Sequence, residues 1–188
     1  QLLVNGKPVL LKGANRHEMD PDGGYVVSLE RMIEDIRILK ENNFNAVRTC
    51  HYPDDARWYA LCDRYGLYLV AEANLESHGM GYDEKTLAKD PAYAKAHLER
   101  NERNVKRNIN HPSVIVWVPL NESWGVRKLL TDGRQKEYAR TMYHLTKAMD
   151  SSRLVSTNDG WEQVGETDIV SIHDYAPVGD GWGEKYAK

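Results

Sequence analysis

An amide and a carboxylate stand side by side at the end of a smooth apolar run. Residues 113–120 read SVIVWVPL, and Asn121 and Glu122 follow directly. A carboxyl group at the end of a buried strand is poorly solvated in its charged form, which raises its pKa toward the range of a general acid. An ion pair with Arg48 would lower that pKa instead, and Asn121 could equally be an amide that shapes its own loop. The spacing favours a general acid at Glu122, with Asn121 as a donor to a ligand hydroxyl.

Similar polar clusters follow each of six apolar segments that look like strands. An isolated polar residue in such a place is most often a cap or a loop residue. Parallel strands in a closed barrel bring their carboxyl ends to one face, however, so six clusters predict one pocket. The clusters are NRHE (15–18), Arg48 with HYP (51–53), EANLESHG (72–79), NES (121–123), NDGWE (158–162) and HDY (173–175).

The long segment 74–89 has the length of a binding loop and carries two further candidate ligands. Glu76 and His78 could give an oxygen and a nitrogen to a divalent cation, with Glu122 as a third ligand. Because Mg²⁺ accepts carboxylates and water more readily than imidazole, spacing alone supports this site only weakly. A metal-dependent hydrolase is therefore one alternative function.

The segments that position these clusters alternate between helix and strand patterns, which is typical of βα units in a parallel sheet. Asn5-Gly6 predicts a hairpin within residues 2–11, because both turn positions tolerate positive φ. The expected strands lie near 10–14, 44–48, 66–73, 113–119, 153–157 and 168–172. The expected helices are 28–43 with Ser28 as its N-cap, a stripe from Trp58 to Tyr65 ended by Gly66, 91–109 with Asp90 as its N-cap, and 134–149.

Two α/β architectures fit this alternation: an open doubly wound sheet and a (β/α)₈ barrel. A doubly wound sheet usually carries a glycine-rich phosphate turn after its first strand, and neither GxGxxG nor GxxxxGK[ST] occurs here. Polar clusters after every strand are what a barrel needs at its active face. The sequence therefore favours the barrel.

Composition narrows the classes of partner. The net charge is -3 and the basic residues are scattered, so nucleic acid and anionic membranes are poor partners. No apolar stretch approaches the ~18–20 residues that a membrane span needs. Cys50 and Cys62 fit no metal spacing and are expected to be reduced core thiols. The location stays unknown at this point, with a cytoplasmic one favoured and a periplasmic or secreted one open. Eleven Tyr and five Trp beside one Phe suit a sugar site and ordinary packing equally well.

Three long runs resemble the catalytic TIM barrel of glycoside hydrolase family 2, the group of β-galactosidases, β-glucuronidases and β-mannosidases. They are GANRHEMDP (13–21), NNFNAVRTCHYPDDARWYALCDRYGLYLVAEANLESHGM (42–80) and NHPSVIVWVPLNES (110–123). The likeness extends from about residue 2 to 175 and is strongest to the β-galactosidases. It implies a retaining β-glycosidase that cleaves terminal β-glycosides by double displacement, using two carboxyl groups.

The resemblance also implies roles for individual residues. Glu122 would be the general acid/base and Asn121 would bind the sugar 2-hydroxyl. The other implied roles are His17 and His51 in the sugar subsite, Arg48 orienting the carboxylates, Tyr175 on the nucleophile, and Glu76, His78 and Glu122 around Mg²⁺. Asn74, Trp124 and Asp159 complete the candidate substrate-binding residues, and no organic cofactor is expected.

The sequence departs from the family pattern in its length. The family's nucleophile is a Glu after the seventh strand, and the sequence reaches Lys188 shortly after the sixth. A full barrel needs ~250 residues, so we expect about six of the eight βα units, flanking β-sandwich domains in a parent protein, and an isolated chain that is inactive. Glu72 is expected to be an orienting carboxylate, and Glu162 stays undecided.

Other functions stay open at this point. Trp124 stands where many β-galactosidases have glycine, which leaves β-glucuronidase and other family 2 activities as alternatives. A sugar-binding barrel without a nucleophile is a further one. Open sheet edges predict that the isolated chain associates with itself.

Overall fold

A parallel sheet in chain order forms the centre of the protein. The computed structural model describes residues 2–73, 91–176 and 185. The strands follow one another in the order β3-β4-β5-β6-β8, all parallel. Because the order of the described strands contains no reversal, this part of the sheet has no switch point of the doubly wound kind, and the barrel prediction is supported. The strands are β3 (Gly13–Arg16), β4 (Ala46–Thr49), β5 (Tyr68–Glu72), β6 (Val114–Val118) and β8 (Leu154–Val155).

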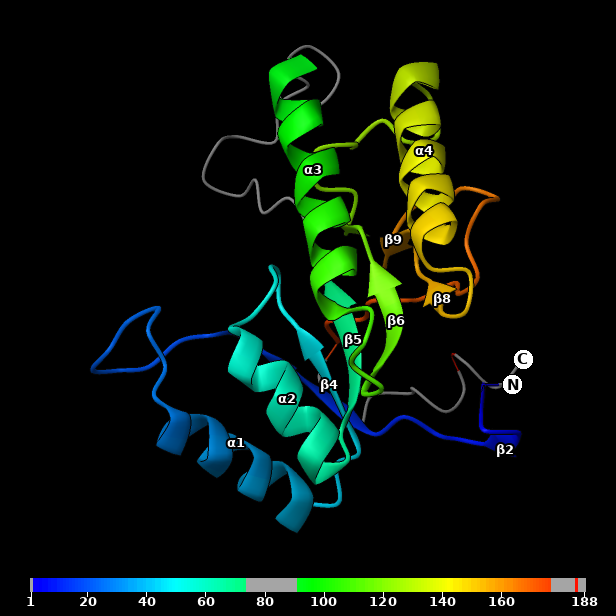
Figure 1. Ribbon diagram of the computed structural model, residues 1–188. Helices are drawn as coiled ribbons and strands as arrows, with labels where there is room; N and C mark the ends of the chain where they lie inside the picture. The colour runs from blue at the N-terminus through cyan, green and yellow to red at the C-terminus, as the bar shows by residue number, and fades with distance from the viewer. Residues whose placement is uncertain (1, 74–90, 177–184, 186–188) are drawn as a thin grey trace.

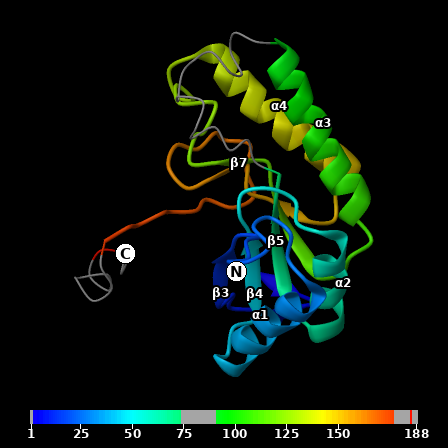
Figure 2. The same cartoon turned by 90° about the vertical axis from the view of Figure 1, so that its left-hand side faces the viewer.

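Four helices lie on one face of this sheet, α1 beside α2 and α3 beside α4 (Figures 1 and 2). They are α1 (Leu29–Glu41), α2 (Ala56–Tyr65), α3 (Pro91–Asn108) and α4 (Gly133–Met149), so all four predicted helices are present. Ser28 caps α1 by accepting from the Arg31 amide, and Gly66 ends α2 with φ 68°. Among the helices that the structure describes, none combines the length and apolar character needed to cross a membrane.

The core lies between the sheet and the helices. Trp58 and Trp117 are fully buried, and Met32 and Ile36 of α1 pack into the same cluster. Cys50 and Cys62 are free and buried, as predicted. The apolar strands therefore act as a fixed wall whose carboxyl ends carry the polar clusters.

Two small pairs of strands lie outside the main sheet. β1 (Leu3–Val4) and β2 (Lys7–Pro8) form the predicted hairpin, with positive φ at both Asn5 and Gly6. β7 (Leu120–Asn121) pairs in parallel with β9 (Asn158–Asp159). Pro119, which has no N–H to donate, separates β7 from β6. The β7–β9 pair extends the wall to the residues that carry the chemistry.

The strand predicted at 168–172 does not form. Val170 and Ile172 are 71% and 66% exposed, and the backbone contact with β8 is a bond from the Asp168 amide to the Val155 carbonyl. The Thr167 hydroxyl also donates to the Ile169 carbonyl. This local bond occupies a carbonyl that would accept a hydrogen bond from a neighbouring strand. The segment therefore does not form a strand, although its composition favours one.

Candidate active site

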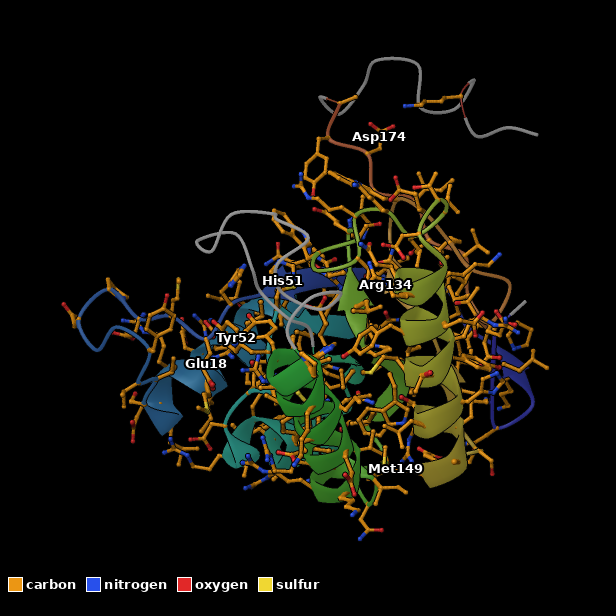
Figure 3. All side chains as sticks on the ribbon, turned by 90° about the horizontal axis from the view of Figure 1, so that it is seen from above. Glu18, His51, Tyr52, Arg134, Met149 and Asp174 are labelled. Atoms are coloured by element: carbon orange, nitrogen blue, oxygen red, sulfur yellow. The ribbon has the colours of Figure 1, made fainter. Side chains whose placement is uncertain are left out.

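The polar clusters meet at the carboxyl ends of the strands, as predicted. A pocket of about 500 Å³ lies there, and four of the six clusters contribute to its lining. Glu72 and Asp159, from the other two clusters, are connected to it through bonds to Arg48, His51 and His173. Figure 3, which looks onto this end, shows His51 near Tyr52 and Glu18, and Asp174 on the segment that leads to the C-terminus. The lining residues are Asn15, Arg48, His51, Glu122, Ile172, His173, Asp174 and Tyr175, and Asp159 of the fifth cluster bonds to Arg48 and His173 behind them.

A second hollow, of about 600 Å³, lies near the amino ends of the strands and beside the hairpin. Its carboxylate, Asp63, is already bonded to His111 and to the Ser113 amide. The pocket at the carboxyl ends is therefore the candidate active site.

Arg48 joins four strand ends. Its Nη2 donates to Glu72 Oε1 at 2.8 Å and to Asn121 Oδ1 at 2.6 Å, and its Nε lies 2.7 Å from Asp159 Oδ2. Its Nη1 reaches Asn15 Oδ1 at 3.4 Å. This guanidinium sets the relative positions of two carboxylates and two amides at these strand ends.

Glu72 is fully buried and also accepts from His51 Nδ1 at 2.8 Å. Burial raises the pKa of the Glu72 carboxyl, and the bond to His51 and the charge of Arg48 oppose that rise. The His17 ring packs edge-on against His51 with centroids 5.3 Å apart; His51 lines the pocket, whereas His17 lines a separate hollow beside Asn15. Burial, His51 and Arg48 all lower the pKa of His17, which favours a neutral ring.

Cys50, His51 and Glu72 offer ligand atoms within 4.8 Å of one another. Arg48, however, already donates to Cys50 Sγ at 3.1 Å and to the same carboxylate. Burial raises the pKa of the Cys50 thiol to about 12, so the thiolate that a metal needs is disfavoured. The Arg48 guanidinium therefore occupies the position that a metal cation would take among Cys50, His51 and Glu72.

Glu122 lies on the pocket wall, and its pKa moves opposite to the expected direction. Burial raises the pKa of this carboxyl, but the hydrogen bonds from Tyr175 and His173 lower it more, so it lies below its usual range. His173 Nδ1 is 2.6 Å from Glu122 Oε1, and the Tyr175 hydroxyl donates to the same oxygen. The expectation of a raised pKa was wrong, because the two donors on segment 173–175, and not an ion pair with Arg48, lower it.

The backbone at Glu122 and Ser123 is left-handed, with φ of 47° and 57°. Such values cost on the order of 1–3 kcal/mol each for residues with a side chain, and they gather at functional sites. Neighbouring groups hold the turn: the Glu122 amide donates to the Asp159 carbonyl, and the Ser123 amide donates to Asn158 Oδ1, both at 2.9 Å. The β7–β9 pair thus fixes the direction of the Glu122 side chain.

Asp159 and His173 form a second pair of interacting polar residues at the pocket, beside Glu122 and its two donors. His173 Nε2 lies 3.5 Å from Asp159 Oδ2. Although burial raises the pKa of Asp159, the bond to His173 and the charge of Arg48 lower it to about 2. The bond to Asp159 raises the pKa of His173, so the pair favours an imidazolium beside a carboxylate.

The remaining predicted site residues are placed differently. Trp124 is 3% exposed and stacks with the Arg127 guanidinium at 5.3 Å, so little of its ring is open to a ligand. Tyr175 is 78% exposed, and the group it bonds is Glu122. Asn74, Glu76 and His78, and with them the N-cap predicted at Asp90, lie outside the described residues.

Sequence reasoning gave no individual role to three residues that the structure places at the site. Asn15 lines the pocket, His173 contacts Glu122, and Asn158 holds the turn at Ser123. All three fall inside the six polar clusters of the sequence, and that clustering was the one signal that could have found them.

Comparison with known proteins agrees with this geometry. A profile described as "Glycosyl hydrolases family 2, TIM barrel domain" matches residues 1–179. A β-galactosidase of Alteromonas mediterranea is 46% identical over 171 residues, and one of Lactococcus lactis is 47% identical over 173 residues. These matches cover 91% and 92% of the chain but 15% and 16% of those proteins, so the chain spans about a sixth of their length.

Solved structures of two β-glucuronidases share the fold. The enzyme from Dictyoglomus thermophilum superposes with a TM-score of 0.73 at 27% identity, covering 90% of this chain and 29% of that one. The enzyme from Ruminococcus gnavus gives 0.71 at 30% identity, covering 81% and 26%. With a parallel sheet in barrel order, polar groups gathered at its carboxyl end and a family profile over nearly the whole sequence, the chain belongs to glycosyl hydrolase family 2, within its TIM barrel domain.

Proposed function

We propose that this chain carries the acid/base side of a retaining β-glycosidase site that acts on terminal β-galactosides. The observation that carries the proposal is Glu122, which lines the pocket at the end of an apolar strand with its Oε1 held by two donors. Relatives named β-galactosidase at 46% and 47% identity support galactose as the sugar. The β-glucuronidase structures make glucuronic acid the second candidate.

Glu122 would serve in both halves of a double displacement. Retaining glycosidases place two carboxyl groups about 5–5.5 Å apart; one protonates the leaving group and later deprotonates water, and the other attacks the anomeric carbon. The lowered pKa of Glu122 suits the base step. The acid step needs a higher pKa, which a bound sugar would favour by excluding water and which an ionised nucleophile nearby would favour by repulsion.

Arg48 and Asn121 would fix the sugar. Arg48 donates to Asn121 Oδ1, which supports an orientation of the amide with Nδ2 as the donor toward the sugar. An amide nitrogen is the group that a sugar 2-hydroxyl would accept from. His17 and His51 would form the neighbouring wall of the subsite, and Asp159, held by Arg48, would lie beside His173.

The nucleophile is proposed to lie outside the described residues. Glu72 is fully buried between Arg48 and His51, and Glu162 is bonded to the Ser123 hydroxyl. Both carboxylates are therefore engaged in positioning their neighbours, in keeping with an orienting role for Glu72.

Magnesium is proposed as a further component, held by Glu76, His78 and Glu122. Only Glu122 lies in the described part of the chain, where it lines the pocket, and a carboxylate is a ligand suited to a hard cation. When bound, the ion would supply a positive charge that fixes the carboxylate. Elemental analysis of the purified protein, with Glu76→Gln as a comparison, tests this: loss of stoichiometric magnesium in the variant is expected, and a metal-free active protein would contradict it.

The function is tested by Glu122→Gln in the complete protein that carries this chain. Proton donation matters most for poor leaving groups, so kcat/KM for methyl β-galactoside should fall by roughly 10²–10⁴-fold. The loss for 2,4-dinitrophenyl β-galactoside should be much smaller, because that leaving group needs no proton. Glu137→Gln on the exposed side of α4 is the matched control and should leave both values unchanged.

Azide gives a second, independent measurement. In Glu122→Ala, azide needs no general base to attack a glycosyl intermediate, so it should restore turnover of the dinitrophenyl substrate and yield β-galactosyl azide. Equal losses in kcat/KM for both substrates in Glu122→Gln would contradict the proposed function. Binding of galactose without turnover in the complete protein would support a sugar-binding barrel instead, and faster turnover of β-glucuronides would reassign the sugar.

A further inference from the structure

The His173 ring lies between two carboxylates that come from different strand ends. Its Nδ1 is 2.6 Å from Glu122 Oε1, and its Nε2 is 3.5 Å from Asp159 Oδ2. Asp159 is itself held by Arg48 Nε at 2.7 Å. A continuous polar chain therefore runs from the guanidinium at the centre of the site to Glu122.

The turn after β9 is shaped to admit this ring. Gly160 has φ 79°, and a Cβ at this position would lie 2.6–2.8 Å from three atoms of the His173 ring. The Gly160 amide also donates to the Ser171 hydroxyl at 2.6 Å, which ties segment 171–173 to the same turn. The position of the imidazole is thus enforced by packing as well as by its two polar contacts.

Glu122 has two donors on the same oxygen, and they differ in how they are held. Tyr175 is 78% exposed, whereas His173 is half-buried against Gly160 and anchored through Asp159. Figure 3 shows Asp174, the residue between them, on the segment that leads away from the body of the protein. His173 is consequently the better fixed of the two donors.

We propose that His173 is a positioning residue that holds the Glu122 carboxylate by Oε1 and leaves Oε2 to meet the leaving group. This inference rests on the proposed function of Glu122. A carboxylate that rotates about its last torsion would move its reactive oxygen away from the glycosidic bond, and a misplacement of 1 Å can cost about a hundredfold in rate. His173 needs no contact with substrate for this role.

Three variants in the complete protein separate this role from a structural one. His173→Phe keeps a ring and removes both donors. His173→Asn keeps a donor near the Nδ1 position but is too short to reach Asp159. Gly160→Ala keeps the His173 side chain itself, but the added methyl group forces the imidazole out of its position. The exposed His144 on α4, substituted as His144→Asn, is the matched control.

We expect His173→Phe and Gly160→Ala to lower kcat/KM for methyl β-galactoside by about ten- to a hundredfold. For 2,4-dinitrophenyl β-galactoside the loss in kcat/KM should be less than threefold. The inhibition constant of galactose should also change by less than threefold. His173→Asn should recover part of the loss seen with Phe. All measurements are made at one pH on samples whose thermal unfolding shows a folded state.

Equal losses with both substrates, or an Asn variant no better than Phe, would overturn the inference. If Glu122→Gln shows the leaving-group dependence and His173→Phe does not, the inference alone is wrong and the proposed function stands. If Glu122→Gln itself leaves turnover unchanged, the proposed function is wrong and the inference falls with it.

Discussion

Asn158 Oδ1 accepts a hydrogen bond from the Ser123 amide at 2.9 Å and thereby holds the turn that aims Glu122. The Asn158 Nδ2 donates to the Ser123 hydroxyl and to the carbonyls of Gly160 and Glu162. One fully buried amide thus connects the two strand-end clusters, and it stabilises two consecutive residues with positive φ.

Asn158→Ala should therefore affect both stability and activity. Each buried group left without a partner costs about 1–3 kcal/mol, so we expect a loss of at least 2 kcal/mol in the free energy of unfolding, measured by urea denaturation. The turn should relax and kcat should fall with it. Asn158→Asp, which keeps the acceptor for the Ser123 amide, should retain more activity than Ala. Equal activity in the two variants would contradict the role given to this acceptor.

Arg48→Ala should be among the most damaging single changes. It removes the guanidinium that both buried carboxylates, Glu72 and Asp159, contact, and breaking a buried pair in this way costs about 3–5 kcal/mol. Arg48→Lys should rescue little, because an ammonium cannot reproduce the fork that contacts several strand ends. Thermal unfolding checks both variants. Arg37→Ala on the surface of α1 removes two exposed ion pairs and should change stability by less than about 1 kcal/mol.

Much of the fold could be predicted because its signals are local. The apolar stripe of α1, the cap at Ser28 and the glycine that ends α2 are all set by residues within a few positions. The strand predicted at 168–172 does not form, because strand formation depends on contacts that are not local. Its composition favours a strand, but a strand needs a partner, and the segment instead turns away after its one backbone bond to Val155.

The sequence predicted which polar clusters come together at the candidate site. It did not predict which side chains in these clusters bond to one another. The donors that lower the pKa of Glu122 lie 51 and 53 positions further along the chain, and no periodicity connects them to it. The positive φ values at Glu122 and Ser123 depend on Asn158 and Asp159 in the same way. Contacts between loops follow from the parallel order of the strands, which brings their carboxyl ends together and which the sequence pattern does not encode locally.

The contribution of Asp159 to stability should depend on pH. Its pKa is about 2 in the folded protein, against an ordinary value of 3.8, so its ionised form is stabilised by folding. This contribution is present above about pH 4 and is lost as the pH falls toward 2. It amounts to roughly 2 kcal/mol. The difference in unfolding free energy between the native sequence and Asp159→Asn should shrink over this range, and a difference that stays constant from pH 5 to 2.5 would show that Asp159 is not the group concerned.

The 188-residue chain, prepared by itself, should associate with itself. β3 and β8 end the order of the main sheet among the described strands, so each offers unpaired backbone groups on one side. Leu10 and Val170 lie near these ends and are 73% and 71% exposed. Sedimentation velocity at tens of micromolar should show species larger than a monomer, and the combined Leu10→Lys and Val170→Lys variant should move the distribution toward the monomer by adding charge to both regions. A monomer across that concentration range in the native sequence would show that these edges are protected by the chain itself.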